Sequence, residues 1–209
     1  MNWNKYFELM ADWKKLPAYK AEPRIDSLVG FFLPEFIESF LNIKSAGIIP
    51  ELPIRLATVK PKHEGTNYAD RSYKVDFLII GNNGINYLIE FKTDSGSRRD
   101  EQDLYLVEAK EAGTESIVNG ILQIAKVSSY KKKYGHLLGK LQSVGLLDEN
   151  YHYSGLNPVF EIVYVQPSNS KNESNVIDFL WISNWLLSNF PNSDFETEFA
   201  NALKIWATD

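Results

Sequence analysis

The chain has 209 residues, a formal net charge of −5 and no cysteine. The length suits one domain with a sizeable core, and the absence of cysteine excludes disulfides and thiolate metal sites. The absence of cysteine makes a cytoplasmic location the default expectation, and no apolar run approaches the ~20 residues that span a bilayer, so we expect no membrane contact. The acidic balance argues against a nucleic-acid coat protein, and a nucleic-acid enzyme of this charge should carry its basic residues in patches.

Apolar residues at helical spacing predict helices over residues 2–15 and 25–43. Pro34 lies inside the second pattern, where a proline kinks or splits a helix. Residues 54–59 alternate Ile, Leu and Val with Arg, Ala and Thr, which predicts a strand packed mainly on one face. Residues 60–72 are polar and predict a connecting loop, which is a candidate substrate-facing segment.

Residues 73–94 predict a β-hairpin, because two apolar runs are joined by an Asn-Asn-Gly turn at 82–84. If these three residues form the loop, with the glycine left-handed, Asp76 faces Glu90 across the hairpin. A two-residue Asn-Gly turn would shift the register by one and place the two carboxylates on opposite faces. We favour the first register because it gathers Asp76, Glu90 and Lys92 on one face.

Charges in apolar strands are costly unless they are paired or used. Carboxylates as close as Asp76 and Glu90 repel each other, and a cation between them removes the repulsion. Mg²⁺, or Mn²⁺ in its place, suits this arrangement, because Mg²⁺ is typically held by one or two carboxylates plus waters and substrate phosphate. Lys92 beside the ion can orient the attacking water and offset charge that develops on the phosphate. The alternative is a structural salt bridge between Lys92 and Asp76 on a solvated sheet edge.

Asp76, thirteen intervening residues and then Glu90-Phe91-Lys92 resemble the signature of the PD-(D/E)XK nuclease superfamily, also called restriction-endonuclease-like. That signature has an Asp at the start of one strand and Glu-x-Lys in the next. The proline of the family name is absent here, since Lys74-Val75 precedes the aspartate. The resemblance covers roughly residues 25–166 and implies a metal-dependent nuclease with an αβββαβ core.

The same resemblance implies further site residues. A glutamate of the first helix often completes the metal site in this superfamily, and Glu35 is the candidate here; a solvated helix glutamate is the alternative. Glu51, which lies between two prolines, is a second candidate for this acid. Gln102 and Tyr105 share one face of the helix after the hairpin. They loosely resemble a Gln-plus-Tyr motif of some members, at a different spacing, and Gln102 is a candidate contact to nucleic acid.

Basic residues after the hairpin are further candidate contacts to nucleic acid. Arg98 and Arg99 follow the Glu-x-Lys strand, where a guanidinium could clamp a phosphodiester in bidentate fashion. A solvated turn is the alternative. A helix predicted over residues 115–134 ends in a basic turn with Lys131 and Lys132, which would give a salt-sensitive grip on DNA. The alternative is that these lysines only complement the helix dipole.

The rest of the chain predicts a short helix and turn over residues 137–147, a buried strand over 158–167 and an edge strand over 176–182. A short helix capped by Ser183-Asn184 and a terminal amphipathic helix complete the pattern.

This order predicts an α/β fold: a three-layer α/β/α sandwich with a mixed central sheet of four or five strands and added N- and C-terminal helices. We expect one domain over 1–209, with the restriction-endonuclease-like core at about 25–166 and helical additions at 1–16 and 183–207. The expected function is Mg²⁺-dependent hydrolysis of DNA, in restriction, repair or bacterial defence. Cutting of both strands would favour a homodimer.

The same residues allow two other classes of function. A catalytically inert relative could act as a binding or structural subunit, although all three signature positions hold chemically competent residues. A carboxylate-pair glycosidase fits poorly, because Lys92 lies two residues from Glu90.

Overall fold

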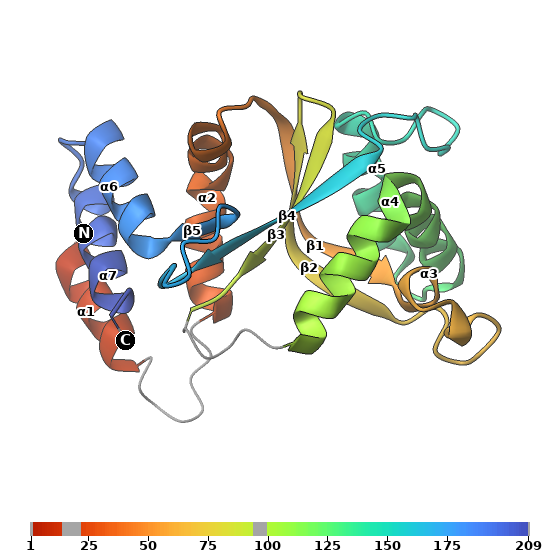
Figure 1. Cartoon of the computed structure of the whole chain (residues 1–209), viewed down its shortest axis with the longest axis horizontal. Helices are drawn as coiled ribbons and strands as arrows, with labels where there is room; N and C mark the ends of the chain where they lie inside the picture. The colour runs from red at the N-terminus through yellow and green to blue at the C-terminus, as the bar shows by residue number, and fades with distance from the viewer. Residues whose placement is uncertain (1, 14–21, 94–99, 209) are drawn as a thin grey trace. The chain divides into compact units, whose positions relative to one another are not determined.

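The computed structural model describes residues 2–13, 22–93 and 100–208. In these residues the chain forms seven α-helices, one 3₁₀ helix and a five-stranded sheet (Figure 1). The strand order is β1-β2-β3-β4-β5; β1 and β3 each pair antiparallel with β2, and β4 pairs parallel with β5. The predicted α/β class with a mixed sheet is therefore confirmed, and it is consistent with a three-layer α/β/α sandwich.

The elements in chain order are α1 (Trp3–Trp13), α2 (Glu22–Leu41), β1 (Ser45–Arg55), α3 (Leu56–Val59), η1 (Pro61–His63), β2 (Ser72–Gly81), β3 (Ile85–Phe91), α4 (Asp100–Val127), α5 (Lys131–Ser143), β4 (Val159–Gln166), β5 (Val176–Asp178), α6 (Phe179–Asn189) and α7 (Asp194–Trp206).

The chain divides into two compact units. The first unit comprises Met1–Phe40, Phe91–Arg98 and Val163–Asp209, and the second unit comprises Leu41–Glu90 and Arg99–Ile162. The two are described separately below.

Aromatic packing holds the first unit together. Phe7 of α1 stacks on Phe199 of α7, with ring centroids 5.5 Å apart, and it meets Trp206 edge-on at 6.3 Å. Phe32 of α2 also stacks on Phe199. Phe7 and Met10 of the first helix are thus core residues, whereas Tyr6 and Trp13 of the same stripe are exposed. Pro34 lies inside α2 without splitting it into two helices.

The second unit is built on the β1-β2-β3 meander and the long helix α4. β1 contains Pro50 and Pro53, which an edge strand tolerates because its outer N–H groups have no ladder partner. α4 is interrupted at Gly113, whose φ of 75° is left-handed. A buried amide cluster fastens this interruption to the sheet, since the amide of Asn86 donates to Thr114 Oγ1 and to the carbonyl of Asn157, both at 3.1 Å.

Several predicted element boundaries are wrong. The strand expected over 54–59 ends at Arg55, and residues 56–59 form α3 because Leu56 and Ala57 donate their N–H groups to loop carbonyls of Arg71 and Ala69. The helix expected over 115–134 ends at Val127, and a new helix, α5, begins at Lys131.

At the C-terminal side, the edge strand expected over 176–182 is only three residues long. The next helix begins at Phe179 and not after the predicted Ser183-Asn184 cap, because the Asp178 carboxylate accepts a hydrogen bond from Trp181 N at 2.7 Å.

Candidate functional site

The β2–β3 hairpin adopts the favoured register. Phe77 pairs with Ile89 and Ile80 with Asn86, and Gly84 in the loop is left-handed with φ 86°. Gly81 fixes the turn from the other side, because a Cβ there would lie 2.5 Å from Asn83 Oδ1. The three-residue loop is therefore confirmed, and the competing two-residue turn is excluded.

This register sets Asp76 directly opposite Glu90, one step beyond the Phe77–Ile89 pair. Opposed residues on neighbouring strands point to the same face, with Cβ atoms roughly 4.5–5.5 Å apart. Glu90 is buried, with 2% of its surface exposed, and Asp76 is half-buried. The register thus places both acidic residues on one face of the sheet, at the hairpin end away from the turn, as predicted.

Helix α4 supplies a polar group to this carboxylate pair. The Tyr105 hydroxyl lies 3.2 Å from Glu90 Oε2 and 3.0 Å from the backbone carbonyl of Lys74, so its one proton is shared between two acceptors. The Tyr105 ring is buried and stacks on Tyr73, with centroids 4.8 Å apart and an interplanar angle of 4°. This stack fixes the hydroxyl at the carboxylate, because neither ring can turn without losing the contact.

Glu51 lies next to Asp76 in the pairing of β1 with β2. The pairs Pro50–Phe77 and Leu52–Val75 place Glu51 opposite Asp76 on the other side of β2. The Glu51 backbone has a left-handed φ of 53°, and its exposed carboxylate pairs with Lys74 Nζ at 2.6 Å. The structure therefore brings the backbone of this candidate acid to Asp76, while its side chain is held by a lysine.

The donor set fits a hard divalent cation. Asp76 and Glu90 offer carboxylate oxygens from adjacent strands, and Tyr105 orients one of them. Within residues 2–13, 22–93 and 100–208, no group of three Asp, Glu or His side chains is arranged to hold a metal. A Mg²⁺ site commonly uses only one or two carboxylates, with waters completing its coordination. The opposed pair is thus the set of residues that would hold the ion.

The two remaining catalytic candidates belong to the first unit. Lys92 follows β3 directly, and its side chain is buried with 3% exposed. Its backbone N–H donates to the carbonyl of Val165 of β4 at 2.8 Å, which continues the sheet past the end of β3. Glu35 lies on α2 with its side chain exposed. Its proposed role as an additional acid stays a prediction.

The predicted nucleic-acid contacts fall into three groups. Arg98 and Arg99 lie outside the described residues. Gln102 belongs to α4, and its side chain is likewise outside the description. Lys131 and Lys132 are exposed, but they begin α5 where the sequence placed them at the end of a helix. The Lys131 ammonium reaches back to the carbonyl of Ala125, at 3.0 Å, so it caps the C-terminal end of α4.

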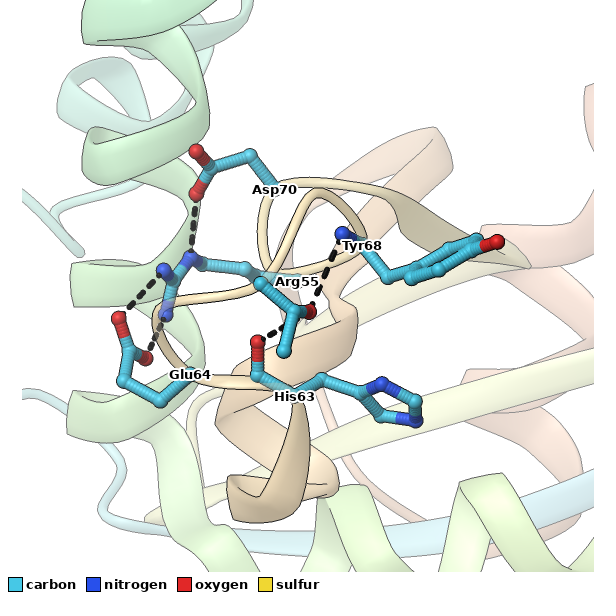
Figure 2. A network of polar contacts seen from close by, with 6 residues as sticks. Arg55, His63, Glu64, Tyr68 and Asp70 are labelled. Carbon is cyan, nitrogen blue, oxygen red and sulfur yellow. Dashed lines mark hydrogen bonds and ion pairs between the residues drawn. The ribbon is translucent and has the colours of Figure 1, made fainter.

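Sequence reasoning missed a second charged cluster, at Arg55 (Figure 2). Arg55 ends β1 and is buried; its guanidinium meets Glu64 in bidentate fashion at 2.7 and 3.0 Å and donates from Nε to Asp70 at 2.8 Å. The hydrogen bond to Glu64 is the main cause that raises the Arg55 pKa, and the same bond lowers the pKa of Glu64. These bonds anchor the loop that the sequence suggested as substrate-facing.

The rings of His63 and Tyr68 point away from that guanidinium (Figure 2). Tyr68 is exposed and lies under the Arg71 guanidinium, 4.5 Å from the ring centroid. The sequence showed no sign of this charged cluster, because the two acidic partners of Arg55 lie nine and fifteen residues further along the chain, in a polar loop.

Comparisons of the chain with protein-family models, with curated proteins and with solved structures found no match. Among the described residues, no helix combines the length and the apolar character needed to cross a membrane.

Proposed function

We propose that this protein is a nuclease that hydrolyses DNA phosphodiester bonds with Mg²⁺ held by Asp76 and Glu90. The observation that carries the proposal is the hairpin register, which sets these two carboxylates opposite each other while Glu90 is buried. A buried carboxylate facing another is unfavourable, because burial and like charge both oppose ionisation. A sheet built only for stability would gain from an apolar pair at this position.

Bound Mg²⁺ would supply charge neutralisation and polarisation of the scissile phosphate. Asp76 and Glu90 would hold the ion, and Tyr105 would keep Glu90 in its orientation through the hydrogen bond at 3.2 Å. Lys92, two residues from Glu90 in the chain, would orient the attacking water and offset negative charge on the phosphate. These roles match the Asp…Glu-x-Lys signature residue for residue.

Plasmid nicking tests the proposal, with wild type, Glu90→Ala and Lys92→Ala assayed in Mg²⁺ and in Mn²⁺. We expect wild type to cleave and both variants to lose about a hundredfold or more of the rate, because each removes charge stabilisation from the transition state. Glu161→Ala and Lys110→Ala are matched controls, since this pair forms a surface salt bridge of 2.6 Å and should leave cleavage unchanged.

Circular dichroism and thermal melting establish that each variant is folded. If folded wild-type protein cleaves neither single-stranded nor duplex nucleic acid with either metal, the nuclease proposal fails. The catalytically inert binding subunit then becomes the better reading. Full cleavage by Glu90→Ala would also overturn the metal-site assignment.

A further inference from the structure

A pocket of about 440 Å³ lies in the second unit between β1, β2 and α5. We call it the β1–α5 pocket. Its floor is apolar and consists of Ile49, Pro50 and Pro53 of β1 and Leu137 of α5. The volume falls within the range of about 300–1,000 Å³ that is typical of small-molecule sites.

The rim of the β1–α5 pocket is cationic. Lys74, Lys133 and Lys140 line it, and Glu51 is its one acidic residue. Glu51 is already paired with Lys74, at 2.6 Å. No carboxylate of the described residues forms an ion pair with Lys133 or Lys140, so these two ammonium groups give the rim a net positive charge in a chain whose formal charge is −5.

Aromatic rings accompany these lysines. Tyr134 lines the pocket and is half-buried, and burial raises its pKa above the ordinary value. Tyr130, one helical turn earlier, is exposed, and Lys133 Nζ lies 5.7 Å from its ring centroid. An apolar floor, a tyrosine face and a lysine rim match the chemistry of a nucleotide, which has a flat apolar base and an anionic phosphate.

The β1–α5 pocket adjoins the carboxylate pair through its own lining residues. Lys74 precedes Asp76 by two residues on β2, and Glu51 lies opposite Asp76 in the register of β1. The backbone carbonyl of Lys74 also accepts a hydrogen bond from the Tyr105 hydroxyl that contacts Glu90. The pocket and the candidate active site therefore lie next to each other along β2.

We propose that the β1–α5 pocket binds one unpaired nucleotide of the substrate strand, with its base against Tyr134 and Leu137 and its phosphate on Lys133 and Lys140. This inference rests on the proposed nuclease function and specifies the class of nucleic acid that the nuclease would prefer. An intact duplex must unpair and unstack a base to fill the pocket, which costs a few kcal/mol. Single-stranded or branched nucleic acid is thus the preferred substrate over uninterrupted duplex.

Binding without cleavage tests this inference. Fluorescence anisotropy in EDTA measures the affinity of labelled oligothymidylate and of a duplex of equal length for the full chain. We expect the single strand to bind more tightly, and thymidine 5′-monophosphate to compete better than inorganic phosphate. Lys133→Glu and Tyr134→Ala should each weaken single-strand binding about tenfold, because they remove a phosphate contact and a stacking face.

Lys204→Glu is the matched control, because it makes the same charge change at an exposed lysine of α7, outside the pocket lining. It should weaken binding by no more than about twofold through long-range electrostatics. Tyr134→Phe keeps the ring and should retain wild-type affinity, which separates loss of stacking from loss of fold. Thermal melting of each variant completes the comparison.

Equal effects of Lys204→Glu and Lys133→Glu would overturn the pocket assignment, as would tighter binding of the duplex. Equal competition by inorganic phosphate would show a phosphate contact without a base site, which also overturns it. Cleavage is measured separately: cleavage with no pocket-dependent binding refutes only this inference, and pocket-dependent binding with no cleavage refutes only the nuclease function.

Discussion

Arg55 and Glu90 are both charged residues buried in the sheet of the second unit, with 6% and 2% of their surface exposed. Arg55 faces two carboxylates of opposite charge, and both remain partly in water, with 64% of the Glu64 side chain and 40% of the Asp70 side chain exposed. Glu90 faces the carboxylate of Asp76 across the hairpin and accepts a hydrogen bond from the neutral hydroxyl of Tyr105.

The difference lies in the sign of the charge that each residue faces. Complementary charges at Arg55 hold a loop in place, and this arrangement is complete in itself. At Glu90 the residue opposite carries a like charge, and like charge and burial both oppose ionisation of a carboxyl group. A buried charge in a strand is therefore no mark of a functional site until its neighbours are known.

The largest expected effect that tests the contrast between Arg55 and Glu90 is a change in Mg²⁺ requirement when Tyr105 is substituted. Tyr105→Phe removes the hydroxyl that orients Glu90 and preserves the ring that stacks on Tyr73. Loss of a group that orients a metal ligand typically costs about 10–100-fold in metal affinity. We expect the Mg²⁺ concentration for half-maximal cleavage to rise by about that factor, with a smaller change in the rate at saturating metal.

Tyr87→Phe is the control for this measurement. Tyr87 is a buried tyrosine on the same hairpin, but its hydroxyl contacts the amide of Asn83 in the turn, at 2.8 Å. If the Mg²⁺ concentration for half-maximal cleavage rises equally in both variants, or in neither, the hydroxyl of Tyr105 has no part in metal binding.

The next effect is on stability. Arg55→Met keeps an apolar stem of similar length and removes the guanidinium that makes three hydrogen bonds to Glu64 and Asp70. We expect the free energy of unfolding to fall by about 2 kcal/mol, since charge-assisted bonds are lost but the two acids can turn to water. Urea denaturation measures this change.

Lys110→Met serves as the comparison for that variant, because Lys110 forms an exposed pair with Glu161 and should cost at most about 0.5 kcal/mol. Arg55→Met should leave the cleavage rate of the folded protein unchanged. If it abolished cleavage with no loss of stability, Arg55 would belong to the active site and the contrast drawn above would be wrong.

The sequence predicted the part of the site whose residues lie close together in the chain. Asp76 and Glu90 meet because a turn of three residues fixes their register, and Asn-Gly chemistry and the glycines at 81 and 84 specify that turn. The orienting hydroxyl of Tyr105 and the Glu51–Lys74 pair depend on packing between distant segments. The β1–α5 pocket depends on it too, so residue spacing gave little or no signal for these features.

The fold errors have the same origin. Residues 54–59 alternate as a strand would, but tertiary hydrogen bonds from Leu56 and Ala57 to the loop turn them into α3. The apolar run from Val176 gives no helical period over so short a stretch, and Asp178 caps a helix inside it. In each case one long-range contact or one cap outweighed a weak local pattern.

The smallest expected effect is a pH dependence at Glu64. The hydrogen bond from Arg55 lowers the Glu64 pKa below its ordinary value of 4.5. A carboxyl with a lowered folded pKa contributes stability that is fully present above the unfolded pKa and is lost as pH falls through the folded pKa. Glu64→Gln should therefore be less stable than wild type at neutral pH, and the difference should shrink as the pH falls below 4.5.

Urea unfolding of both proteins between neutral pH and acid measures that convergence, and Glu161→Gln shows the baseline for an exposed carboxylate. A difference that stays constant through the acid range would mean that ionisation of Glu64 does not stabilise the loop. Arg55 would then act through its packing and through Asp70. The contrast with Glu90 would then rest on the bond between Arg55 and Asp70 alone.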